Sequence, residues 1–133
     1  MKKTRSNMYI SIFWNSFDIN ELIKILWIKP TESYRKWDKN LKNIKAPLRQ
    51  ETSWEYSTWY IENYDISINY KIILTKFADK VNIINKFVKN NNLDIKITIS
   101  SIIEDNIMPW LYFEKDFIKF LNNIWAELDI DIN

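Results

Sequence analysis

The chain has 133 residues, a net charge of +2, and no histidine, cysteine or glycine. Its length fits a single domain (residues 1–133), and 47% hydrophobic with 27% charged residues is typical of a globular protein. Without His and Cys, the common serine and cysteine hydrolases and Cys/His zinc sites are excluded, and without Gly so are phosphate-binding loops. No apolar run has signal or membrane-span length, so we expect a cytoplasmic protein without membrane association, metal or cofactor.

The N-terminal part of the chain predicts a strand followed by a helix. Tyr9–Phe13 is apolar and rich in β-forming residues, which favours a strand. Asp18 suits a helix N-cap, with Glu21 three residues later as in a capping box. Apolar residues at helical spacing then predict a helix that ends near Trp27, and Pro30 supports that stop.

The middle of the chain predicts a long loop, a strand and a broken helix. Thr31–Gln50 has little periodicity and is expected to be a loop with at most short regular structure. Trp54–Ile61 is aromatic and β-prone, which predicts a strand. Apolar residues at helical spacing run from about residue 65 to residue 90, with a break expected at Asp79–Lys80.

The last third of the chain predicts a strand, a turn, a short strand, a helix and a final strand. Alternation makes Leu93–Ser100 the clearest strand, and Glu104–Pro109 is expected to be a turn before a short strand at Leu111–Phe113. One apolar stripe predicts a helix over Phe117–Ile124. Leu128–Ile132 alternates again, which predicts a strand with one buried face and one acidic face.

These elements follow the order β-α-β-α-β-β-α-β. A mostly antiparallel sheet with helices on one face, a two-layer α+β sandwich, would bury the apolar patterns. Among named motifs, a ferredoxin-like relative comes nearest.

Charge is unevenly distributed and gives the candidate binding residues. Residues 29–49 carry seven basic residues against two acids, whereas residues 104–133 carry seven acids against two lysines. Such a split can steer partners, although two solvated surfaces are the ordinary explanation. The candidates are Lys29, Thr31, Arg35, Lys36 and Asp38 in the basic segment and Asp129 and Asp131 in the acidic one.

Three kinds of function fit this composition. The first is a non-catalytic module that binds another protein. The second is single-stranded nucleic-acid binding by the basic segment and nearby aromatics, disfavoured because only three arginines accompany sixteen lysines. The many Ile, Asn and Lys residues are also typical of an AT-rich gene, which gives the lysines another explanation. The third is an enzyme using Asp129 and Asp131, whose ordinary role would be to face water.

Several segments together resemble a bacterial family described only as domain of unknown function 4279. The resemblance covers most of the chain and implies a small, non-catalytic α+β domain without established activity, with an immunity (antitoxin-like) role as one version of the protein-binding function. It is carried by the first strand with Asp18 to Leu26, Ile28-Lys29-Pro30-Thr31, Arg35-Lys36-x-Asp38, Tyr56-Ser57-Thr58, Pro109-x-Leu111 and Ala126 to Ile132.

The sequence departs from that family pattern at tryptophans. Trp27, Trp37, Trp110 and Trp125 stand where the family tends to have glycine. Trp27 and Trp125 also lie at expected helix ends, where left-handed glycine is common, and Trp110 follows proline where a type II turn favours glycine. We hypothesise that UGA codons for glycine have been read as tryptophan. The alternative is genuine core or surface aromatics. If the hypothesis holds, Trp14, Trp54 and Trp59 are in doubt as well, and several rings should be exposed.

Overall fold

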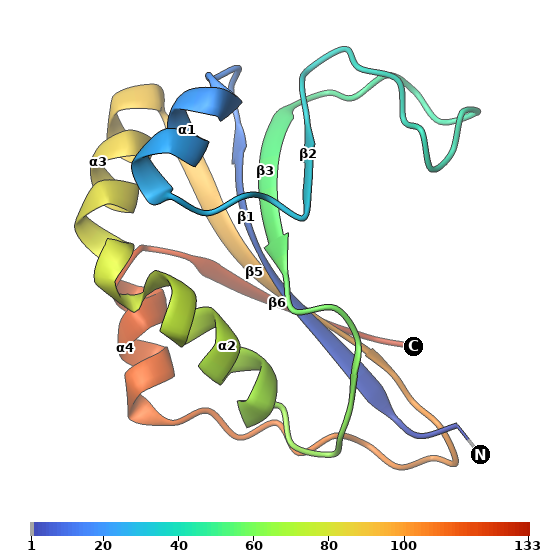
Figure 1. Cartoon of the computed structure of the whole chain (residues 1–133). Helices are drawn as coiled ribbons and strands as arrows, with labels where there is room; N and C mark the ends of the chain where they lie inside the picture. The colour runs from blue at the N-terminus through green and yellow to red at the C-terminus, as the bar shows by residue number, and fades with distance from the viewer. Residues whose placement is uncertain (1) are drawn as a thin grey trace.

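The computed structural model describes residues 2–133, which form one sheet with helices packed on one side (Figure 1). The strand order is β2-β3-β1-β5-β6, with β4 also paired to β1; β5 and β6 are parallel and the other pairs antiparallel. The predicted α+β class with a mostly antiparallel sheet is therefore confirmed. In chain order the elements are β1 (Arg5–Trp14), α1 (Ile19–Leu26), β2 (Glu32–Tyr34), β3 (Thr52–Ser57), β4 (Ile61–Glu62), α2 (Ser67–Phe77), a 3-10 turn η1 (Ala78–Lys80), α3 (Val81–Asn91), β5 (Leu93–Ile102), α4 (Lys115–Asn123) and β6 (Glu127–Ile132).

The central strand β1 gives the sheet one apolar and one polar face. Met8, Ile10 and Ile12 are fully buried on the helix side. The intervening residues Asn7 and Tyr9 point to the opposite side, because successive side chains of a strand alternate between faces. Register with β3 and β5 extends this division, so that Ile97 lies beside Ile10 and Thr98 beside Tyr9.

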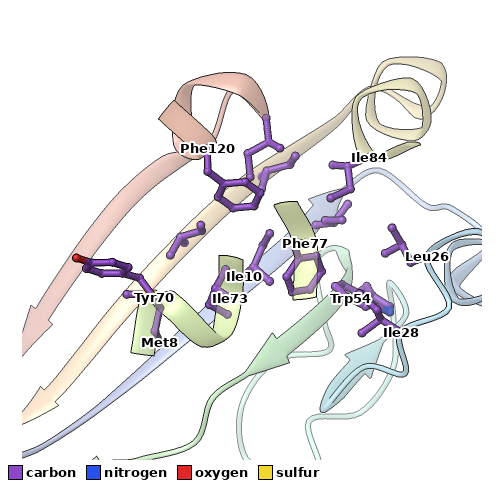
Figure 2. Close-up of a cluster of buried hydrophobic side chains, with 14 of the residues drawn as sticks. Met8, Ile10, Leu26, Ile28, Trp54, Tyr70, Ile73, Phe77, Ile84 and Phe120 are labelled. Atoms are coloured by element: carbon purple, nitrogen blue, oxygen red, sulfur yellow. The ribbon is translucent and has the colours of Figure 1, made fainter. Parts of the chain in front are cut away.

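The core lies between the apolar sheet face and the helices (Figure 2). Trp54 of β3 is fully buried and meets the ring of Phe77 edge to face, with 6.0 Å between ring centroids. Tyr70 of α2 stacks on Phe117 of α4 at 4.8 Å. These contacts fix α2 against both the sheet and α4, and leave the helix-free face of the sheet uncovered.

The predicted helices are confirmed, and the cap and the end predicted for α1 are present. Asp18 caps α1 by accepting a hydrogen bond from the Glu21 N–H at 3.2 Å, and the helix ends at Trp27. The expected break at Asp79–Lys80 is the 3-10 turn η1 between α2 and α3. None of the helices in the described part of the chain is long and apolar enough to cross a membrane.

Three predicted strands differ from the structure. Trp54–Ile61 is divided between β3 and β4. Leu111–Phe113 is irregular because its backbone has no strand partner in residues 2–133, although Leu111 and Phe113 pack against the core. β6 forms as predicted, but its apolar side is not a buried face: Ile130 is 39% exposed and Ile132 42% exposed. β6 is an edge strand, and the helix layer covers mainly its start.

Candidate functional site

The helix-free face of the sheet carries mostly polar side chains, of which Ser11 and Thr98 are buried among their neighbours. Tyr9 lies opposite Ser57 on one side and Thr98 on the other, and Thr98 lies opposite Asp129. The next row along β1 joins Glu55, Ser11, Lys96 and Glu127 in the same way. Each row crosses four strands, so this polar face spans most of the width of the sheet.

Carboxylates dominate the polar face. At its strand positions, acidic side chains outnumber the cations, which are Lys96 and, at the start of β1, Arg5. A potential of one sign over a surface attracts groups of the opposite charge. The acidic positions, taken from the strand registers, are Glu32, Glu55, Asp94, Glu127, Asp129 and Asp131.

A cleft of about 480 Å³ lies where the polar face meets the loop of residues 35–51. Asn7, Tyr9, Glu55 and Ser57 form its floor on β1 and β3. Lys42 and Arg49 of the loop line it from above. In Figure 1 this loop projects from the ends of β2 and β3, on the side of the sheet away from the helices.

Two cations of the loop are bound to the sheet. The Arg49 guanidinium lies over the ring of Tyr34, 3.9 Å from its centroid, and its Nη2 is 3.7 Å from Glu32 Oε1. Lys42 Nζ lies 2.9 Å from Glu32 Oε2. Glu32 therefore neutralises part of the basic loop.

Glu55, which lies opposite Glu32 on the adjacent strand, has no such partner. In the three ion pairs found among residues 2–133, Glu55 does not take part. Burial, and then repulsion from Glu32, raises the pKa of the Glu55 carboxyl. Burial also raises the pKa of the Tyr9 hydroxyl on the same floor. The Glu55 carboxylate accepts one long hydrogen bond, from Ser53 Oγ at 3.5 Å, and forms no ion pair, so it has free acceptor capacity for an incoming cationic or hydrogen-bond-donating group.

The predicted site residues are divided among three places. Thr31 and Asp38 line the cleft. The Thr31 hydroxyl is used inside the fold, where it accepts the Ser57 N–H at 3.0 Å and donates to the Glu55 carbonyl at 3.2 Å. The Asp38 carboxylate accepts the Arg35 N–H at 2.8 Å, which fixes a turn of the loop.

The remaining candidates do not line the cleft. Lys29, Arg35 and Lys36 are exposed around the loop. Asp129 and Asp131 are exposed on β6, at the edge of the sheet opposite β2. The sequence thus located part of the cleft lining, Thr31 and Asp38, and the β6 edge of the polar face, but not the cleft floor on β1 and β3.

The cleft floor was missed by sequence reasoning. The available signal was the alternation within β1, where polar Asn7, Tyr9 and Ser11 separate buried apolar residues. That signal shows a solvent-facing side of a strand. It does not show which residues of β3 lie beside it.

In the part of the chain that the structure describes, no group of three or more carboxylates is placed to hold a metal ion.

A family model described as Domain of unknown function (DUF4279) matches residues 2–133. The chain belongs to the DUF4279 family. The resemblance seen in the short motifs is thereby confirmed over nearly the whole chain. Neither the curated proteins nor the solved structures gave a match.

Proposed function

We propose that this DUF4279 protein is a non-catalytic module that binds another protein through the polar face of its sheet. The observation that carries the proposal is the uncovered acidic face with a cleft at one end. The partner is a protein that presents a basic segment, because charge complementarity guides and orients association. A lysine or arginine of that segment would enter the cleft and pair with Glu55.

The loop of residues 35–51 supplies the apolar contacts that a protein interface needs. Leu41, which lines the cleft, is 86% exposed, and Ile44 on the same loop is 82% exposed. Exposed aliphatic groups beside a polar surface are typical of the core and rim of a protein interface. The partner would therefore contact the loop and the polar face together.

A lysine-rich peptide provides a direct probe. We expect its titration to shift backbone amide NMR signals of β1, β3, β5 and β6 and to leave α1–α4 unchanged. The doubly neutralised variant Asp129→Asn/Asp131→Asn should bind it several-fold more weakly, because two charges leave the polar face.

The matched control is Asp79→Asn/Asp116→Asn, which removes two exposed carboxylates from the helix side. Binding should be retained in this variant. Equal weakening of both variants, or signal changes centred on the helices, would contradict the proposal.

An immunity role is the narrower version of this proposal. It rests on the same acidic face, which suits a basic toxin domain. If a toxin gene lies beside this one, co-expression of the chain should rescue cells, and Asp129→Lys/Asp131→Lys should abolish rescue. Full rescue by that charge-reversed variant would exclude this face from the contact.

Single-stranded nucleic-acid binding is the alternative that one observation favours. Arg35, Lys36 and Lys39 are exposed on the loop, and Lys36 Nζ lies 5.2 Å from the ring centroid of Trp37. Binding by these cations should be salt-sensitive and should fall on Lys36→Ala. No retention of the protein on single-stranded DNA at low salt would remove this alternative.

A further inference from the structure

Five tryptophans adopt backbone conformations that disfavour side chains with a Cβ. Their φ angles are positive: 120° at Trp14, 59° at Trp27, 75° at Trp37, 62° at Trp59 and 56° at Trp125. Positive φ brings Cβ close to the backbone and is rare for bulky residues, whereas glycine adopts it freely.

The other residues at positive φ form an instructive contrast. In residues 2–133 they are Asn92, Asp105 and Asn106. Asn and Asp are the residue types that tolerate this region best after glycine. Apart from the tryptophans, the chain therefore follows the ordinary preference at every such position.

Two of the five positions end helices in the manner of glycine. After α4, the Trp125 N–H donates to the Asn122 carbonyl at 3.1 Å and the Ala126 N–H donates to the Leu121 carbonyl at 3.0 Å. These two bonds form a Schellman motif, in which the left-handed residue is usually glycine. Trp27 ends α1 in the same left-handed conformation.

The rings of these five residues are poorly buried. Exposure is 89% at Trp27 and 86% at Trp125, and Trp14, Trp37 and Trp59 are each more than half exposed. Tryptophan usually contributes through the large area that it buries. At these positions the ring gains little while its Cβ strains the backbone.

Trp54 and Trp110 differ from that group. Trp54 is fully buried against Phe77 and is not at positive φ, although its buried indole N–H has no hydrogen-bond partner among residues 2–133. Trp110 is 74% exposed but is not at positive φ, so the expected type II turn glycine is not required there. Backbone conformation and burial thus divide the seven tryptophans into three groups: the five at positive φ, the buried Trp54 and the exposed Trp110.

We infer that the five tryptophans at positive φ are glycine in the protein that the cell makes, encoded by UGA codons that its translation reads as glycine. Decoding UGA as tryptophan would produce the present sequence. It would also explain much of the absence of glycine from 133 residues, where average usage gives about nine.

The inference changes the cleft as well as the caps. Trp59 lines the cleft, and glycine there would widen it above Ser57. Glycine at residue 37 would remove the ring beneath Lys36. The aromatic stacking surface would be lost, while the acidic floor of the cleft would remain.

The coding DNA tests the inference without a folding experiment. We expect UGA at the codons of Trp14, Trp27, Trp37, Trp59 and Trp125, and UGG at the codon of Trp54. UGG at most of the five codons would overturn the inference. UGA at Trp54 would contradict the distinction drawn from burial.

The stability of purified variants is the second test. The variant with Trp→Gly at all five positions should unfold at a higher urea concentration than the present chain, with a folded-to-unfolded ratio roughly threefold higher per position, since relief of left-handed strain exceeds the entropy cost of glycine. Trp54→Gly should instead lower the midpoint, because it empties part of the core. A five-position variant that is less stable than the present chain would overturn the inference.

Discussion

Glu55 is the residue whose environment departs most from that of a surface carboxylate. It lies on the cleft floor, faces Glu32 across the strands and has a raised pKa caused first by burial. Below its ordinary value near 4.5, the carboxyl is protonated in both the folded and unfolded states. As pH rises through the raised folded pKa, the unfolded chain ionises first, so stability is lost.

The substitution Glu55→Gln should therefore stabilise the protein at neutral pH and have little effect at pH below the ordinary value. The measurement is the free energy of urea unfolding for both proteins across this pH range. The difference between them should grow as pH rises. A difference that is constant with pH would show that Glu55 ionises normally in the fold.

At the scale of elements, α2 is joined to β1 by a buried amide. Asn69 Nδ2 donates to the Ser6 carbonyl at 2.8 Å and to Thr58 Oγ1 at 3.0 Å. Asn69→Ala leaves that carbonyl without its donor and should lower the unfolding free energy by roughly 1–3 kcal/mol. The control Asn85→Ala removes an exposed bond to the Asn123 carbonyl and should change it by about 0.5 kcal/mol or less.

In the proposed interface, exposed apolar groups of the loop of residues 35–51 contact the partner. Leu41→Ser/Ile44→Ser should leave the free energy of unfolding within about 0.5 kcal/mol of the original, because both side chains are exposed. The same variant should bind the partner more weakly. Unchanged partner binding would remove the loop from the interface.

Elements with a strong local signal were predictable from the sequence. The Asp18 cap, the break at Asp79–Lys80 and the alternation of β5 each depend on neighbouring residues, and each is present in the structure. The prediction that β6 has a buried face was wrong. Periodicity shows only which residues of a strand share a face. It does not show whether another element covers that face.

The candidate site was predictable only at its margins. Asp129, Asp131 and the basic loop stood out by charge, because charge is visible without pairing. The cleft depends on the register that places Tyr9 beside Ser57 and Glu32 beside Glu55. Such long-range pairing is absent from local sequence patterns.

At the scale of the whole molecule, the sheet has a sealed side and an open side. Helices cover the apolar face. No helix covers the acidic face, which the loop of residues 35–51 borders at one end (Figure 1). The central functional claim is that the open side binds the partner. Because no surface side chain belongs to both sides, charge substitutions on one side can be compared directly with those on the other.

Affinity capture from the cells that make this protein tests that claim most directly. The original chain, Asp129→Lys/Asp131→Lys and the helix-side control Asp79→Lys/Asp116→Lys would be compared in parallel. A partner retained by the original chain and by the control should be lost from the sheet-face variant. Retention by the sheet-face variant together with loss from the control would contradict it.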